Sequence, residues 1–168
     1  MTPHETFAAL LSECGRALFE AYGVSSTEAS RPARVEGLDA RVAAIIGFTG
    51  DSLRGSLMLG MNPEALEASR QTERDRPQDW IAELTNQLVG RFKNRLAAYD
   101  VDIVITTPLV IRGERLSPVM DGDAAPLVWT LGEGRAYGWL DVEVQPGLEL
   151  VERPGAAAVA AEGEALLF

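Results

Sequence analysis

The sequence predicts an α+β fold in which one antiparallel sheet of about five to six strands packs with two long helices and one short helix. Two long segments, near the N-terminus and between residues 77 and 99, carry apolar residues at helical spacing. Between and after them lie short segments rich in β-branched residues, separated by glycine- and proline-containing turns, which is typical of antiparallel strands. No repeat or clear linker divides the chain. We therefore expect a single domain over residues 1–153, followed by an Ala-rich tail over residues 154–168.

The N-terminal segment has the signals that begin and end a helix. Thr2 can cap the helix, Pro3 suits its first position, and Glu5 can complete a capping box. Gly23 is a natural end. One apolar stripe runs along the predicted helix through Phe7, Leu10, Leu11, Cys14, Leu18 and Tyr22. Because Cys14 lies on this stripe, we expect it to be a buried small residue and not a nucleophile.

The next segments predict a loop, a hairpin and a short helix. Residues 25–34 are polar and include a proline, so they read as a loop. Residues 41–48 and 54–61 read as two strands joined by a turn at residues 50–52. Asn62-Pro63-Glu64 then caps a short helix that ends at about Arg70.

Pro77 begins the longest predicted helix, which ends near Tyr99. Three strands are expected after it, over residues 101–107, 127–131 and 137–145, with the first one ended by Pro108. Residues 118–125 read as a loop. Gly132-Glu133-Gly134 begins like a dinucleotide-binding fingerprint, but its third glycine is out of register, so a hairpin turn explains it better.

Composition and charge exclude several classes of partner. Fifteen Lys and Arg against 25 Asp and Glu give a net charge of −10, and the arginines are scattered. Nucleic acids and anionic membranes both select basic patches, so neither is an expected partner. The longest apolar runs, such as residues 42–46, are too short to cross a bilayer. No signal peptide is recognised, and the single cysteine fits a reducing compartment, so we expect a cytoplasmic protein.

Most standard active sites are missing from the sequence. His4 is the only histidine, so Ser-His-Asp and Cys-His arrangements and an HExxH zinc helix are excluded. No serine elbow with closing glycine occurs. Asp121-Gly122-Asp123 lacks a surrounding calcium loop and reads as a solvated turn. No metal site is therefore expected.

The helix over residues 77–99 has two distinct faces on a helical wheel at roughly 100° per residue. The predicted buried face consists of Ile81, Leu84, Leu88, Phe92, Leu96 and Tyr99, and the outer face of Glu83, Asn86, Gly90, Lys93, Asn94 and Ala97. Glu83 and Asn86 are neighbours there because they are three residues apart. A glycine inside a helix costs about 1 kcal/mol relative to alanine. Gly90 would let another backbone come close, although a simple solvated polar face is the alternative interpretation.

The order of motifs around this helix resembles the CheC/CheX/FliY family of chemotaxis phosphatases. Glu83-Leu84-Thr85-Asn86, followed by Gly90 and Lys93, is similar to the family's E-x-x-N…G…K helix. Residues 48–61 are similar to its glycine-punctuated hairpin, and residues 105–113 to the strand, proline and glycine that follow the signature helix. The resemblance covers roughly residues 5 to 150. Only one E-x-x-N helix occurs, which resembles CheX and not the two-site CheC pattern.

The resemblance implies a phosphatase of phosphorylated CheY-type receiver domains of response regulators. Glu83 would pair with the receiver's active-site lysine, and Asn86 would orient the water that attacks the aspartyl phosphate. Gly90 would relieve crowding at the docked partner, and Lys93 and Asn94 would contact the receiver rim. The magnesium ion would belong to the receiver, so no cofactor of this chain's own is expected. A homodimer is also implied.

Two other functions stay open from the sequence. The same fold could serve as a non-catalytic module that binds a receiver or a flagellar-switch component, although such a module would not need Glu83 and Asn86 together. A small-molecule or lipid-binding domain would need an apolar cavity under the sheet, and nothing in the sequence demands one.

Overall fold

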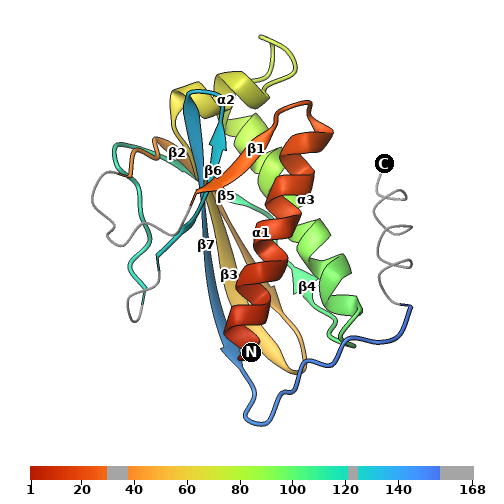
Figure 1. Cartoon of the computed structure of the whole chain (residues 1–168). Helices are drawn as coiled ribbons and strands as arrows, with labels where there is room; N and C mark the ends of the chain where they lie inside the picture. The colour runs from red at the N-terminus through yellow and green to blue at the C-terminus, as the bar shows by residue number, and fades with distance from the viewer. Residues whose placement is uncertain (30–37, 121–124, 156–168) are drawn as a thin grey trace.

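Figure 1 shows the computed structural model of the chain, in which residues 1–29, 38–120 and 125–155 are described. Three helices and seven strands are formed by these residues. They follow in the order α1 (Pro3–Ala21), β1 (Ser26–Ala29), β2 (Val42–Thr49), β3 (Leu53–Met61), α2 (Pro63–Ser69), α3 (Pro77–Ala97), β4 (Val104–Ile105), β5 (Leu109–Arg112), β6 (Leu127–Leu131) and β7 (Gly134–Val144).

The strands form one antiparallel sheet in the order β1-β6-β7-β3-β2-β4, with β5 also paired to β2. β3 and β7 are the longest neighbours and pair over nine residues, from Leu53↔Val144 to Met61↔Ala136. β5 pairs with the start of β2 and β4 with its end, so the two short strands lie in line along one edge of β2. This arrangement confirms the predicted α+β class with an antiparallel sheet.

Both long helices cover the same face of the sheet (Figure 1). Aromatic side chains join the two helices to the sheet: Phe92 of α3 lies edge-on to Phe7 of α1 at 6.4 Å and is tilted against Phe48 of β2 at 6.2 Å between ring centroids. These three rings are buried in the main hydrophobic core. α3 therefore packs against the sheet on one side and against α1 on another, and only the side that faces away from both is accessible.

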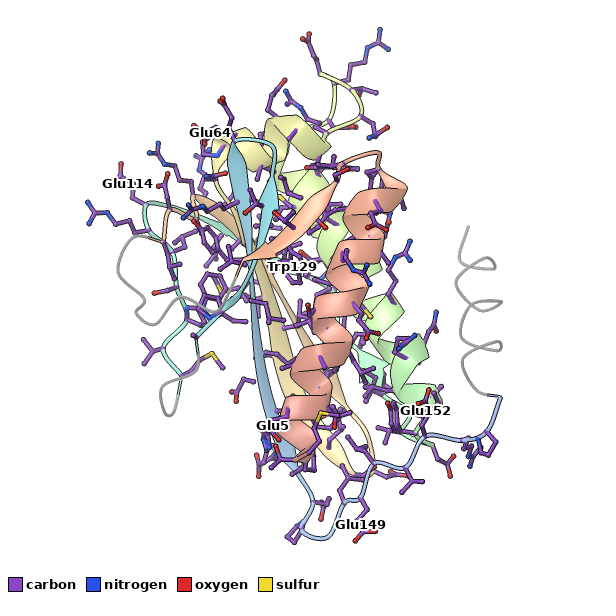
Figure 2. The ribbon with its side chains drawn as sticks, viewed as in Figure 1. Glu5, Glu64, Glu114, Trp129, Glu149 and Glu152 are labelled. Atoms are coloured by element: carbon purple, nitrogen blue, oxygen red, sulfur yellow. The ribbon has the colours of Figure 1, made fainter. Side chains whose placement is uncertain are left out.

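Trp129 of β6 connects α1 to the other half of the sheet (Figure 2). Its indole is completely buried, lies edge-on to Phe19 at 5.8 Å, and donates a hydrogen bond from Nε1 to the Ser12 carbonyl oxygen at 3.3 Å. A second, smaller apolar cluster lies on the opposite face of the sheet around Met58, Tyr137 and Trp139. The sheet is thus covered by helices on one face and by chain segments without regular structure on part of the other.

The predicted N-caps of α1 and α2 are present in the structure. Thr2 and Glu5 form the predicted capping box, in which Thr2 Oγ1 accepts from the Glu5 amide and Glu5 Oε2 accepts from the Thr2 amide. Asn62 caps α2 by accepting from the Ala65 amide at 3.0 Å, and it also accepts from the Arg135 amide at 3.0 Å. The second bond ties α2 to the start of β7, which the sequence did not indicate.

The loop predicted at residues 25–34 is wrong at its start, because Ser26–Ala29 form β1. This strand pairs with β6, from Ser26↔Leu131 to Ala29↔Val128, so its partner lies about a hundred residues further along the chain. A short edge strand can be polar, since only one of its edges is paired. Residues 30–34 lie outside the described residues.

The single strand predicted at residues 101–107 is also wrong in extent. Only Val104 and Ile105 pair with β2, whereas Val101 and Ile103 are buried in the core before the pairing begins. Pairing resumes after Pro108 as β5, and Thr106 bridges the interval because its Oγ1 accepts from the Gly47 amide. β1 and the division into β4 and β5 explain why seven strands are found where five to six were expected.

The remaining expectations hold within the described residues. The hairpin at residues 41–61, the helix after Asn62 and the two C-terminal strands are confirmed, with the turn at Gly132-Glu133 between the last two. Residues 121–124 of the predicted loop and residues 156–168 of the predicted tail lie outside the described residues, so the boundary at residue 153 stays a prediction.

Candidate functional site

The predicted site lies on α3, whose inner face is packed as the wheel indicated. Ile81, Leu84, Leu88, Phe92 and Leu96 are all completely buried. Tyr99 follows the end of the helix and is only partly buried. Thr85 and Val89 are completely buried as well, so the inner face is broader than predicted. The exposed side of α3 is therefore narrower than predicted, and few residues of the helix lie on it.

Glu83 and Asn86 both lie exposed on that outer side. They project about one helical turn apart, because residues three apart in a helix are neighbours. Among the described residues, none forms a hydrogen bond with the Asn86 side chain. The structure therefore brings a carboxylate and an unengaged carboxamide together on one accessible strip, as the sequence predicted.

Glu83 is held by Gln87, which is not one of the predicted site residues. Gln87 Nε2 donates to Glu83 Oε1 at 2.7 Å and to the hydroxyl oxygen of Tyr22 at 2.6 Å. The spacing of four between Glu83 and Gln87 is a signal for such a pair. The bond to Tyr22, at the C-terminal cap of α1, could not be found that way because the residues are 65 positions apart.

The three residues predicted to bind the partner lie further along α3 and are less accessible. Gly90, Lys93 and Asn94 are half-buried. Lys93 Nζ lies 3.5 Å from Asp102 Oδ1, so its charge is already paired within the chain. Asn94 Nδ2 is buried and has no hydrogen-bond partner among the described residues. The outer strip thus divides into an open half at Glu83 and Asn86 and a more enclosed half from Gly90 to Asn94.

The described residues offer no other site with comparable chemistry. No group of three or more His, Cys, Asp or Glu side chains among them could hold a metal ion. A hollow of about 280 Å³ lies at the end of the β2–β3 hairpin, lined among others by Thr49, Arg54 and Glu143, and contains none of the predicted site residues. No helix within residues 1–29, 38–120 and 125–155 is long and apolar enough to cross a membrane.

A protein-family comparison identifies the fold that carries this site. The model of the chemotaxis phosphatase CheX matches residues 42–128, more than half of the chain's 168 residues. The matched part contains β2, β3, α2, all of α3, β4 and β5, and it ends at the start of β6. The chain belongs to the CheX family. No curated protein matched the chain in a sequence search.

Solved structures of CheX-type proteins share the fold of this CheX-family chain. CheX from Vibrio vulnificus is 16% identical, with a TM-score of 0.67 over 82% of this chain and 99% of that one. A CheC-like protein from Shewanella oneidensis is 18% identical, with a TM-score of 0.67 over 82% and 97%. A CheX–CheY–BeF3–Mg complex from Borrelia burgdorferi is 19% identical, with a TM-score of 0.58 over 84% and 98%. At these identities the likeness establishes the fold.

Proposed function

We propose that this chain is an aspartyl-phosphate phosphatase that acts on a phosphorylated CheY-type receiver domain through Glu83 and Asn86. The observation that supports the proposal is the pair itself: both side chains lie exposed and adjacent on α3, which the core and α1 hold in place. A binding partner could reach both groups at once without any rearrangement of the fold. The CheX-family membership of the chain supplies the class of reaction.

Glu83 provides the docking charge. An exposed carboxylate attracts an ammonium group, and the pair gains strength when docking excludes water from it. We therefore assign Glu83 to the receiver's active-site lysine. This contact would fix the position of α3 along the receiver surface, so that the residue one turn further along enters the receiver's site.

Asn86 provides the orientation of the attacking water. A carboxamide has both a donor and an acceptor, so it can hold one water molecule in one direction. The water oxygen attacks phosphorus in line with the bond to the aspartyl oxygen. That bond breaks, and the products are free aspartate carboxylate and inorganic phosphate, with the water's proton passing to phosphate or solvent. An acyl phosphate is already activated, so positioning without a strong base is sufficient.

The receiver supplies the rest of the chemistry in this proposal. Magnesium would neutralise charge on the phosphoryl group from the receiver's side, so Glu83 and Asn86 need hold no metal. The Borrelia burgdorferi structure contains CheX, CheY, BeF3 and Mg together, so a protein of this fold binds CheY. The family resemblance also implies a homodimer, which sedimentation of the purified chain would test.

The test is the decay rate of a phosphorylated receiver domain, measured with and without this protein. We expect acceleration by the natural sequence and a loss of about 100-fold with Asn86→Ala, which is the order of effect produced by misplacing a reacting group. Asn86→Asp keeps the size of the side chain but replaces its donor with a negative charge near the phosphoryl group, so it should be equally inactive.

Gln78→Ala is the matched control, because Gln78 is an exposed amide on the same helix. It should retain the full rate. Equal acceleration by Asn86→Ala and the natural sequence would contradict the assignment of Asn86. Binding to the phosphorylated receiver without any acceleration would show a docking module of the same fold instead of an enzyme.

A further inference from the structure

We infer that Gln87 is a positioning residue for receiver docking, which holds Glu83 in its binding orientation and is itself anchored by Tyr22. The inference rests on the proposed function, because it concerns how Glu83 meets the receiver's lysine. Neither the family comparison nor the sequence pattern assigns Gln87 or Tyr22 a role in docking. The inference is based on one amide nitrogen, Nε2 of Gln87, which donates hydrogen bonds to Glu83 on α3 and to Tyr22 at the end of α1.

The Gln87 amide uses both of its hydrogens. Nε2 lies 2.7 Å from Glu83 Oε1 and 2.6 Å from the Tyr22 hydroxyl oxygen, and a carboxamide nitrogen has two N–H groups to donate. Gln87 is half-buried, whereas Glu83 is exposed. The contact therefore steers the carboxylate from the side of the protein and leaves its solvent side open to an incoming ammonium group.

Tyr22 is itself held in place by contacts with several elements. Its ring lies edge-on to Trp80 of α3, at 5.0 Å between centroids and 85° between planes. The Trp80 indole is buried and donates to Ser69 Oγ of α2 at 3.1 Å. The carbonyl oxygen of Tyr22 accepts from Gln71 Nε2 at 3.4 Å. The end of α1, the end of α2 and the start of α3 are thereby connected, and Gln87 extends this connection to Glu83.

Two physical consequences follow for docking. An exposed glutamate samples several rotamers and loses that freedom when it binds, so a side chain already held near its bound rotamer binds more tightly. Gln87 is also uncharged, so it orients the carboxylate without neutralising it. A lysine at position 87 could form the same contacts, but its charge would compete with that of the receiver's lysine. The effect should therefore fall on receiver affinity and not on the chemical step, which depends on Asn86.

The experiment compares the dissociation constants of the natural sequence, Gln87→Met and Tyr22→Phe for a receiver domain loaded with beryllofluoride and magnesium. Methionine fills a similar volume without donating hydrogen bonds. We expect Gln87→Met to weaken binding by about 2- to 10-fold, the range for the rotamer freedom that one long side chain must then lose on binding, with kcat unchanged. Tyr22→Phe leaves α3 intact and removes only the anchoring hydroxyl, so it should weaken binding in the same direction by less.

A double-mutant cycle with Glu83→Ala separates positioning from structural damage. If Gln87 acts through Glu83, then Gln87→Met should have no further effect on the dissociation constant once Glu83 is alanine. Gln78→Met, on the same helix, should bind like the natural sequence.

The outcomes for this inference and for the proposed function are distinct. If the natural sequence binds the loaded receiver and both Gln87→Met and Tyr22→Phe bind it equally well, the positioning role is overturned and the proposed function stands. An equal loss from Gln87→Met with and without Glu83 would overturn it as well. No binding by the natural sequence to any receiver would remove the proposed function, and this inference with it.

Discussion

Replacing Gly15 with alanine tests the packing between α1 and the sheet most directly. An added Cβ at Gly15 would lie 2.2 Å from Cζ2 and 2.3 Å from Cε2 of Trp129. The indole cannot move away from Gly15, because it is also packed tightly against Gly138. A Cβ added at Gly138 would lie 2.7 Å from Cη2 and Cζ3 of Trp129. The hydrogen bond from Nε1 to the Ser12 carbonyl oxygen further fixes the ring. Trp129 is thus held between two glycines on different elements.

Two effects of opposite sign decide the magnitude. In the interior of a helix, alanine is favoured over glycine by about 1 kcal/mol. Forcing an extra methyl group into a packed core costs about 1–3 kcal/mol, and the short distances at Gly15 place it at the upper end. The free energy of unfolding should therefore fall by roughly 1–2 kcal/mol. For a protein of this size that corresponds to a Tm lower by about 2–8 °C.

The assay is urea unfolding followed by circular dichroism, with the midpoint compared between variants at constant slope. Ala9→Gly is the matched control, because Ala9 is exposed on the same helix and should show only the propensity cost of about 1 kcal/mol. Trp129→Phe should reduce the penalty of Gly15→Ala, since a smaller ring leaves room for the methyl group. A Gly15→Ala variant that is more stable by about 1 kcal/mol would refute the reasoning.

Three further predictions concern the core, a cap and a titrating group. Phe92→Ala should lower the free energy of unfolding by about 3–5 kcal/mol in urea, because it empties a completely buried site between α1, α3 and β2. Asn62→Ala should cost about 2–3 kcal/mol by the same measurement, because it removes the α2 cap and leaves the Arg135 amide without its acceptor. Burial, and secondarily Glu152, raise the pKa of Tyr99 above its ordinary value of 10.0. The contribution of the neutral phenol to the free energy of unfolding is fully present below about pH 10 and is lost as pH rises further. Above about pH 10, the free energy of unfolding of the natural sequence should therefore fall relative to that of Tyr99→Phe. An equal fall in both would contradict this.

Much of the fold could be predicted because its signals are local. The cap at Thr2, the proline after Asn62 and the apolar residues at helical spacing in α3 act over one or two turns. Their consequences therefore appear in the sequence itself. The same periodicity predicted that Glu83 and Asn86 share the exposed side of α3, because the side that carries Leu84 and Leu88 must face the core. Whether that pair is catalytic stays a prediction from the family resemblance.

The features that the sequence did not indicate all depend on residues far apart in the chain. β1 was read as loop because its short polar segment becomes a strand only by pairing with β6. Pairing with β2 likewise divides residues 104–112 into two strands around Pro108. Trp129 packs against Gly15 of α1 and Gly138 of β7, and Gln87 of α3 contacts Tyr22 at the end of α1. No local pattern in the sequence connects these elements. The helical period alone shows that Glu83 and Asn86 face solvent. What holds Glu83 in place follows only from tertiary packing, because packing brings side chains from separate elements within hydrogen-bonding distance.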